Sequence, residues 1–414
     1  MSVKVKGFLL GLIFALLSIP AFLFFYKPYV QPIKVGILHS LTGTMALSEV
    51  SVKNATLMAI EEINAQGGVL GRSLEPVIFD GASEASVFME GAEKLITQDD
   101  VSVVFGCWTS ASRRSVKPIF EKHKNLLFYP VQYEGVEQSP HIIYTGSVPN
   151  QQIIPGIFWA FKNLGQRFFI VGSDYIFPRV ASEIIKEQIK SIGGEFAGEA
   201  YIPLGEKNVQ GVIDQLIAAK PTVILNLING DTNIAFFQLL REKGIMPSQI
   251  PTMSFSIGEQ ELLSLDLKSM IGDYAVWSYF QSINSHTNAD FIVKFQRRFP
   301  GKVVITDPME AAYFGVHLWA KAAQKAGTAN PQVVLQFIEQ NFPAPEGVVY
   351  LDSQNHHTWK FARIGKIRFD GQFAIIWDSN HQVKPEPYLP IKSKKQWDAF
   401  VQKLYLGWGK KWEK

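Results

Sequence analysis

A regular alternation of β-rich runs with amphipathic helical stretches is the feature that most constrains the fold of this chain. The β-rich runs of the first series lie at residues 33–38, 76–79, 101–107 and 125–129. Helical patterns separate them: one begins at Ser51 or Asn54 and ends at Gly67-Gly68, and others cover 84–96 and 111–122. Strands that alternate with helices of this length predict a parallel sheet with helices on both faces.

The same alternation starts again after Pro149. Strands are predicted at 167–172, 194–202 and 222–227, and helices at 179–192, 209–219 and 231–243. Later helices are predicted at 289–299, 308–326 and 331–340. An Asp370-Gly371 pair predicts the turn of a hairpin made by 359–367 and 373–377. An extended stretch at 385–390 and a helix at 394–404 complete the pattern.

A chain of 414 residues is too long for one small core, so we expect two compact units of ordinary domain size. The fold class predicted is α/β, with two doubly wound lobes joined by a hinge. Lobe 1 is predicted to comprise 33–150 plus about 281–345, and lobe 2 to comprise 151–280 plus about 346–384. Residues 385–414 then form a C-terminal tail, and 1–30 form a signal or membrane segment.

The N-terminal segment predicts the cellular compartment. Lys4 and Lys6 precede an uncharged apolar run at 8–26, whose length is close to the ~20 residues that span a bilayer. Bulky residues at 22–26 leave no good small-residue cleavage site, which favours an uncleaved anchor over a cleaved leader. By the positive-inside rule, everything after Tyr26 is extracytoplasmic. We therefore expect a protein anchored to the outer face of the cytoplasmic membrane by residues 8–26.

Composition and missing motifs argue against several classes of protein. A net charge of +3 with interspersed acidic and basic residues lacks the basic stripe that nucleic acid requires. Cys107 is the only cysteine, which excludes an internal disulfide and a multi-cysteine metal site. His356-His357 is the only histidine pair, and adjacent residues on a strand point to opposite faces. Without a dinucleotide, phosphate-loop or nucleophile-serine motif, we expect no cofactor, no metal and no catalytic residue.

Polar and aromatic side chains gather where the predicted strands end. Doubly wound lobes bind ligands at the carboxyl ends of their strands, and the loops there are rich in hydroxyl, amide and aromatic groups. A small planar amide offers N–H donors and a carbonyl in one plane, so these groups suit it. The predicted ligand-binding residues are Trp108, Thr109, Ser110, Tyr129, Gln132, Tyr133, Glu134 and Tyr175.

Each of these residues also has a simpler structural interpretation. Trp108 and Tyr129 can be ordinary core packing. Ser110 can serve as the cap of the helix that follows it. Glu134 can be a solvated loop charge. If these residues do not bind the ligand, the loops at 39–44 and 229–232 are the next candidates.

Several stretches of the sequence are similar to one known family. VVFGCWTSASRRSV at 103–116, LLFYPVQYEGVEQSP at 126–140, VGSDYIFPR at 171–179 and NHHTWKFARIGKI at 355–367 resemble the substrate-binding protein of urea ABC transporters. The aromatic stretch at 394–411 is also similar to that family. The related amide-sensing negative regulators share its type I periplasmic-binding fold. In the amide-sensing regulators, the position of Trp108 resembles a tyrosine, and the positions of Val131-Gln132 resemble threonine-proline. In this sequence, all three positions have the residues of the urea type.

The resemblance implies a crevice built by Trp108, Ser110 and residues 129–134, with Tyr175 in the opposite lobe. It implies a protein that captures urea or a short-chain amide and delivers it to the permease and ATPase subunits of an ABC transporter. The alternative is a membrane-tethered amide or urea sensor that regulates a partner protein. An amide hydrolase is disfavoured, because the chain has neither a nickel-ligand histidine cluster nor an activated nucleophile.

Overall fold

The computed structural model describes residues 30–301 and 304–414. The chain divides into two compact units, Met1–Pro32 and Ile33–Lys414, and the second of these is described below. The apolar run at 8–26, predicted to be an anchor, lies outside the described residues. Within the described ranges, no helix is both long and apolar enough to cross a membrane.

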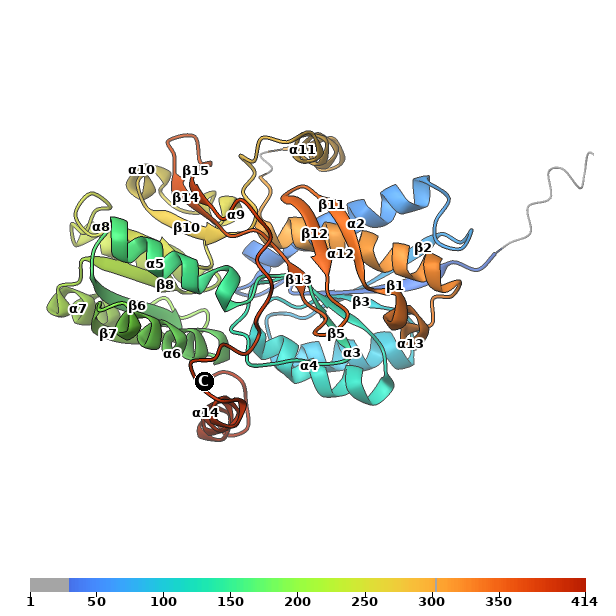
Figure 1. Ribbon diagram of the computed structural model, residues 1–414, viewed down its shortest axis with the longest axis horizontal. Coiled ribbons are helices and arrows are strands. Elements are labelled where there is room, and N and C mark those ends of the chain that lie inside the picture. The colour runs from blue at the N-terminus through green and yellow to red at the C-terminus, as the bar shows by residue number, and fades with distance from the viewer. Residues whose placement is uncertain (1–29, 302–303) are drawn as a thin grey trace, which may run out of the picture. The chain divides into compact units, whose positions relative to one another are not determined.

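A five-stranded parallel sheet is formed by the first part of this unit (Figure 1). Its order is β2-β1-β3-β4-β5, with strands β1 (Ile33–His39), β2 (Leu74–Asp80), β3 (Val104–Gly106), β4 (Leu127–Tyr129) and β5 (Ile142–Tyr144). The connecting helices are α2 (Ala46–Ala65), α3 (Ala85–Thr97) and α4 (Ser110–His123). Because β1 lies between β2 and β3, the connections diverge there, and the loops after β1 and β3 lie at the point where ligands bind in doubly wound sheets.

A seven-stranded sheet follows, in the order β15-β14-β10-β9-β8-β6-β7. Its parallel strands are β6 (Arg167–Ser173), β7 (Glu195–Ile202), β8 (Val223–Leu227), β9 (Thr252–Ser254) and β10 (Tyr274–Trp277). The hairpin of β14 (Arg363–Ile367) and β15 (Phe373–Asp378) adds two antiparallel strands. Gly371 has a φ of +78°, which explains why a glycine is needed in the turn that the sequence predicts. The helices of this part are α5 (Ile153–Asn163), α6 (Ile176–Ser191), α7 (Gln210–Ala219) and α8 (Thr232–Glu242).

A third, small sheet corrects one sequence-based expectation. A helix is predicted over 331–340, but the structure has only α13 (Pro331–Val334) and the 3-10 turn η2 (Leu335–Phe337) as helical elements in this range. The chain then forms β11 (Gln340–Ala344), which pairs with β12 (Gly347–Leu351), and β12 pairs with β13 (Thr358–Trp359). Pro343 and Pro345 explain the difference, because proline excludes a continuing helix and favours extended residues before it. The first helix also begins earlier than predicted, at Ala46.

The remaining helices lie between or after these strands in the sequence. They are α9 (Glu259–Leu262), α10 (Leu267–Met270), α11 (His286–Arg298), α12 (Asp307–Ala326), α14 (Lys394–Gly407) and the 3-10 turn η1 (Pro149–Gln151). Although it comes late in the sequence, α12 packs against α2, and its Trp319 is fully buried with the strands of the first sheet. The segment before it, after β10, and the segment after it, before β14, therefore connect the two sheets.

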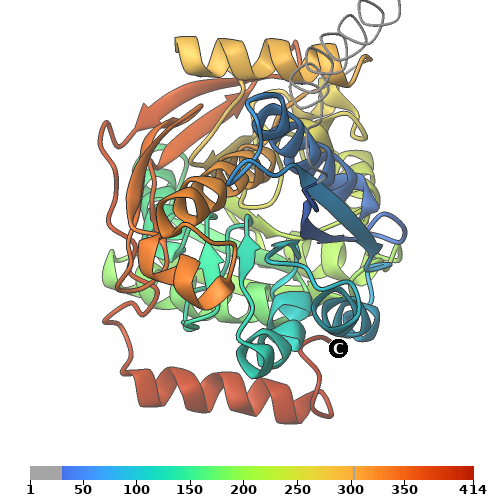
Figure 2. The ribbon, with the colours of Figure 1, turned by 90° about the vertical axis from the view of Figure 1, so that its right-hand side faces the viewer.

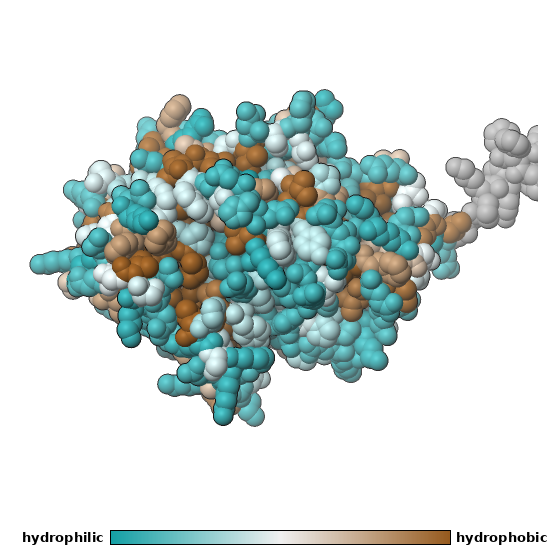
Figure 3. Space-filling model, viewed as in Figure 1, coloured by the Kyte–Doolittle hydropathy of each residue, from teal (hydrophilic) through white to brown (hydrophobic). Residues whose placement is uncertain are grey.

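Helix α14 lies against α6, beside the seven-stranded sheet (Figures 1 and 2). Its Trp397 and Val401 are buried in the same cluster as Ile176 and Ile184 of α6. The outer surface over α14 is mainly hydrophilic (Figure 3). This amphipathic division explains why the tail is ordered as a docked helix: one apolar stripe is removed from water while the lysines stay solvated.

Candidate functional site

The loop after β3 carries the first group of predicted site residues, and helix α4 begins within it. Thr109 is the residue that caps α4, because its hydroxyl accepts a hydrogen bond of 3.0 Å from the amide of Ser112. Ser110, for which capping was the simpler interpretation, instead donates its hydroxyl to a carboxylate oxygen of Glu134 at 2.5 Å. The α4 cap thus leaves Ser110 directed at the loop after β4.

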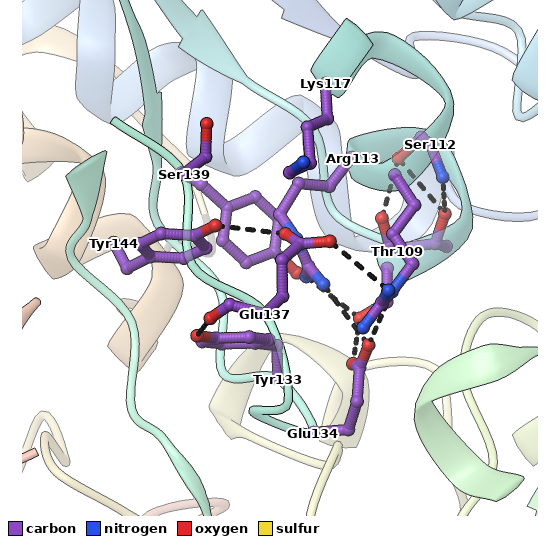
Figure 4. A network of polar contacts seen from close by, with 12 residues as sticks. Thr109, Ser112, Arg113, Lys117, Tyr133, Glu134, Glu137, Ser139 and Tyr144 are labelled. Carbon is purple, nitrogen blue, oxygen red and sulfur yellow. Dashed lines mark hydrogen bonds and ion pairs between the residues drawn. The ribbon is translucent and has the colours of Figure 1, made fainter. Parts of the chain in front are cut away.

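Four buried charged residues form a closed network at this point, which we call the Arg113 network: Arg113, Arg114, Glu134 and Glu137 (Figure 4). Glu134 accepts from Arg113 at 3.2 Å and from Arg114 at 3.0 Å. Glu137 accepts from Arg113 at 2.8 Å, and Arg114 lies 3.5 Å from its other oxygen. Glu134 is fully buried, so its interpretation as a solvated loop charge is wrong. Two cations and two anions leave the network without net charge.

The pKa values follow from this pairing. Burial raises the pKa of the Glu137 carboxyl, but the guanidinium groups of Arg113 and Arg114 outweigh burial and lower this pKa to about 2. Burial would lower the pKa of Arg113, but Glu137 and Glu134 hold it well above its ordinary value. Both groups are therefore ionised at neutral pH.

Arg113, Arg114 and Glu137 were not among the residues selected from the sequence. Charged residues on a helix are usually solvated, so the Arg113-Arg114 pair alone does not indicate a buried site. One signal was available. The first turn of α4 contains no acidic residue and two arginines follow at once, although the N-terminus of a helix disfavours cations. Arginines at that position indicate carboxylate partners nearby.

Aromatic rings enclose the network on the side of the first sheet. The guanidinium of Arg113 lies over the rings of Tyr129 and Tyr133, at 4.7 Å and 4.4 Å from their centroids. The Tyr129 hydroxyl donates to the carbonyl oxygen of Trp108 at 2.6 Å. Tyr133 stacks on Tyr144 with ring centroids 5.0 Å apart, and the Tyr144 hydroxyl donates to Glu137 at 3.0 Å. Tyr133 therefore packs among first-sheet residues, while Tyr129 continues towards Trp108.

Side chains of the second sheet meet this group from the opposite side. The indole N–H of Trp108 donates to the side-chain oxygen of Asn229 at 3.1 Å, and the Gln132 amide donates to the carbonyl oxygen of Phe255 at 2.9 Å. Tyr175, at the start of α6, is 2% exposed. Burial raises the pKa of Tyr175 well above its ordinary value, and the nearby Tyr129 and Glu134 add to the rise.

The structure thus brings all eight predicted residues to one region, where the strand ends of the two sheets face each other. Asn229 belongs to the loop at 229–232, which was the next candidate. From the other alternative loop, Thr44 donates its hydroxyl to Asp231. Ser147 and Ser278 add a further hydroxyl contact of 2.7 Å between the two parts of the chain. Which of these residues touch a ligand stays a prediction.

The charged groups of the Arg113 network are directed at each other. The Ser110 and Tyr129 hydroxyls and the Trp108 indole N–H each donate to another protein group, so a ligand at this point would have to share or replace these partners. In the described part of the chain, no cluster of His, Cys, Asp or Glu residues could hold a metal ion. Cys107 is buried, and burial raises the pKa of its thiol, so it is not a reactive nucleophile.

The two adjacent histidines have different partners. His356 contacts the carbonyl oxygen of Ser139 through Nδ1 at 3.1 Å. His357 contacts the Tyr133 hydroxyl through Nε2 and stacks on Tyr144 with centroids 4.2 Å apart. Burial lowers the pKa of His357 to about 3, so it is neutral at physiological pH. The pair therefore does not converge on one point.

Comparison with known proteins gives the following. The family model of the periplasmic binding protein domain matches residues 33–394. A leucine-, isoleucine-, valine-, threonine- and alanine-binding protein of Pseudomonas aeruginosa is 25% identical over 365 residues, which cover 83% of this chain and 92% of that protein. A limonene hydroxylase of Geobacillus stearothermophilus is 30% identical over 123 residues, and these cover 30% of this chain but only 22% of the hydroxylase.

Solved structures show the same fold. A solute-binding protein of an ABC transporter from Rhodopseudomonas palustris, in complex with p-hydroxybenzoic acid, superimposes with a TM-score of 0.78 at 20% identity and covers 86% of this chain and 98% of its own. A leucine-binding protein from Thermotoga maritima gives a TM-score of 0.74 at 17% identity, with coverages of 84% and 98%.

Proposed function

From the premise that this chain belongs to the periplasmic binding protein domain family, we propose that it captures urea or a short-chain amide for an ABC transporter. The family consists of extracytoplasmic solute-binding proteins of the type I fold, and the chain is such a protein rather than an enzyme. According to its name, the Pseudomonas aeruginosa relative binds leucine, isoleucine, valine, threonine and alanine, and the Rhodopseudomonas palustris structure contains p-hydroxybenzoic acid. The choice of an uncharged amide therefore rests on the residues of this chain.

The observation that carries the proposal is the charge balance of the Arg113 network. An amino acid brings a carboxylate and an ammonium group, and a benzoate brings a carboxylate. In a buried site each of these charges needs a partner, because an unpaired buried ion costs several kcal/mol, by rough estimate. Arg113 and Arg114 already share Glu134 and Glu137 at salt-bridge distance. A neutral planar molecule makes no such demand.

The aromatic and polar groups around the network suit the same ligand. Trp108 and Tyr129 belong to the first sheet's side and Tyr175 to the second sheet's side, and all three are buried aromatic side chains. A planar amide stacks on aromatic ring faces, so these residues suit it. The Ser110 hydroxyl and the fourth lone-pair position of the Glu134 carboxylate supply hydrogen-bonding capacity, since Glu134 accepts three bonds from described residues. Thr109, Gln132 and Tyr133 complete the proposed site, chiefly by holding the loops after β3 and β4.

The proposal also includes the organisation of the whole chain. We propose that 33–150 plus about 281–345 and 151–280 plus about 346–384 move as two lobes, with 385–414 as a tail. Residues 8–26 anchor the protein beside the permease and ATPase subunits. In 1 M NaCl the Debye length is roughly 3 Å, so proteins that are held to membranes by charge are released. A hydrophobic anchor is not weakened by salt in this way, so this protein should stay with the membranes. Release into the soluble fraction by salt contradicts the anchor.

Calorimetric titration of the full chain tests the ligand. We expect urea, formamide or acetamide to bind, and leucine and 4-hydroxybenzoate not to bind. Tyr175→Ala should weaken that binding by roughly tenfold to a hundredfold, because it removes one wall of the site. Tyr350→Ala is the matched control, because the Tyr350 hydroxyl donates to Glu339 at an exposed position and Tyr350 is not one of the proposed site residues. Binding of leucine or the benzoate, with no binding of urea or amides, overturns the proposal.

A further inference from the structure

Residues 410–414 lie directly against the loop that carries Tyr175, and we call this segment the strap. The amide of Ile176 donates to the carbonyl oxygen of Trp412 at 3.0 Å, and the amide of Lys414 donates to the carbonyl oxygen of Asp174 at 3.0 Å. Together these bonds make Tyr175 and Glu413 an antiparallel bridge pair. The strap thus extends the backbone hydrogen bonding of the loop between β6 and α6.

The strap also contacts the first sheet's side of the site. The guanidinium of Arg114, a member of the Arg113 network, lies 5.1 Å from the ring centroid of Trp412. That ring packs in turn on Tyr405 of α14, with centroids 4.4 Å apart. Because α14 is docked on α6, the Trp412 side chain connects the helix of one sheet to the start of α4 on the other.

Three neighbouring hollows show where the strap sits. One of about 430 Å³ is lined by Glu84, Arg114, Trp412 and Glu413, and one of about 420 Å³ by Thr44, Gly205, Glu413 and Lys414. A third, of only about 10 Å³, lies between Ser40, Thr109, Ser112 and Glu413. Glu413 borders all three, so the strap fills space between loops of the two sheets.

We propose that the strap is a latch of the binding site: it fixes the Tyr175 loop and retards release of the bound solute. Trp412 and Lys414 are positioning residues in this account, because they act through the backbone at 174–176. The inference rests on the proposed function for its ligand. The strap is held by the two backbone hydrogen bonds, the contacts of the Trp412 ring with Arg114 and Tyr405, and an ion pair of 3.9 Å between Lys414 and Asp174. These contacts are few compared with those of the fold, so the strap can open more easily than the fold, which is what a latch requires.

The test compares full chains that differ only in the strap. A truncation after Gly409 removes it, and Lys414→Pro deletes the single N–H that bonds to Asp174 while leaving the extended backbone of Glu413 acceptable. Lys414→Ala is the matched control, since it keeps that N–H. Stopped-flow fluorescence measures urea association and dissociation, and hydrogen exchange measures the amide of Ile176.

We expect the truncation to accelerate exchange at Ile176 and urea dissociation by roughly tenfold, and Lys414→Pro to accelerate dissociation by roughly threefold relative to Lys414→Ala. Association should stay unchanged, because a latch acts after capture. Unchanged exchange at Ile176 in the truncated chain overturns the latch, and so does faster exchange with an unchanged dissociation rate. If the parent chain binds neither urea nor amides, the proposed function fails, while exchange at Ile176 still decides whether the strap orders the loop.

Discussion

Two buried clusters of charged side chains in the described part of the chain differ in their charge balance. The Arg113 network pairs two arginines with two glutamates. The second, which we call the Lys360 cluster, sets one lysine among three carboxylates: its Nζ lies 2.6 Å from Glu346, 3.7 Å from Glu310 and 3.9 Å from Asp307. One cluster lies in the proposed binding site and the other lies where the chain passes between the sheets.

The difference in balance appears in the pKa values. In the Arg113 network the pKa of Glu137 falls to about 2. In the Lys360 cluster, burial and the neighbouring Glu346 raise the pKa of Glu310 well above its ordinary value, and burial raises that of Asp307. Pairing with arginine therefore favours the ionised form of Glu137, whereas burial and crowding of carboxylates favour the protonated forms of Glu310 and Asp307. The proposal of a neutral ligand depends on this difference, because the arginines of the first cluster already have carboxylate partners.

The Lys360 cluster also holds the segments that connect the two sheets. The amides of Ser278 and Tyr279 both donate to Asp307, at 3.0 and 2.9 Å, and the amide of Glu346 donates to Glu310 at 3.2 Å. These backbone positions lie before α12 and before β12. Asp307 and Glu310 thus fix the segments that connect the two sheets, because they accept hydrogen bonds from backbone N–H groups. The hydrogen bonds described above for the Arg113 network come from side chains instead.

Removing the only cation of the Lys360 cluster should have the largest effect. Lys360→Met leaves three buried carboxylates without a counter-ion, and we expect the free energy of unfolding at pH 7 to fall by about 3–5 kcal/mol. Acidification to pH 5 should recover part of this loss, because protonation removes the repulsion. Denaturation with guanidinium chloride, in the absence of urea, measures the free energy of unfolding at both pH values. Lys403→Met, on the exposed face of α14, is the control, and equal stability of the two variants contradicts this account.

Removing one anion of the Arg113 network should have a smaller effect, directed at the ligand. Glu134→Gln keeps the shape but leaves two guanidinium groups with one carboxylate. We expect urea affinity to fall by about 1.5–3 kcal/mol, or roughly tenfold to a hundredfold. Titration of the folded variant beside Glu339→Gln, an exposed glutamate, provides the comparison. If Glu134→Gln binds urea as the parent does, the network is structural only.

Proton uptake near the Lys360 cluster should make stability depend on pH. Burial raises the pKa of Glu259 to about 8, with Glu261 and Asp307 adding to the rise. Because the folded pKa exceeds the ordinary value of 4.5, the stabilisation is complete below about pH 4.5 and is lost as the pH rises through about 8. We expect the free energy of unfolding to fall by on the order of 1 kcal/mol from pH 6.5 to 7.5. Glu259→Gln should flatten this slope, and an equally steep slope in that variant would refute the assignment.

The smallest effect is expected at His356. The His356 ring makes its hydrogen bond with the carbonyl oxygen of Ser139. His357, in contrast, stacks on Tyr144 beside the Arg113 network. His356→Ala should therefore change urea affinity by less than roughly twofold. His357→Ala serves as the contrasting variant in the same titration series. A clear loss of affinity in His356→Ala would place the ligand nearer to His356 and β13 than proposed.

Sequence patterns were sufficient for the parts of this fold that depend on local chemistry. The strand and helix alternation, the turn at Asp370-Gly371 and the gathering of Trp108 and Tyr129 at strand ends all follow from period and residue type. Partners of buried charges did not follow, because Arg113 meets Glu137 only after the fold brings two loops together. The same holds for Lys360, whose sequence neighbours do not indicate the three carboxylates around it.

A crystal structure of the full chain with urea tests the central claim most directly. The account predicts urea between Trp108, Tyr129 and Tyr175, with Arg113 and Arg114 still paired to Glu134 and Glu137. Ring faces should cover the plane of the ligand, and a Glu134 oxygen should accept one of its N–H groups. The claim is contradicted if the ligand lies elsewhere, or if a carboxylate ligand displaces Glu134 or Glu137 from either arginine.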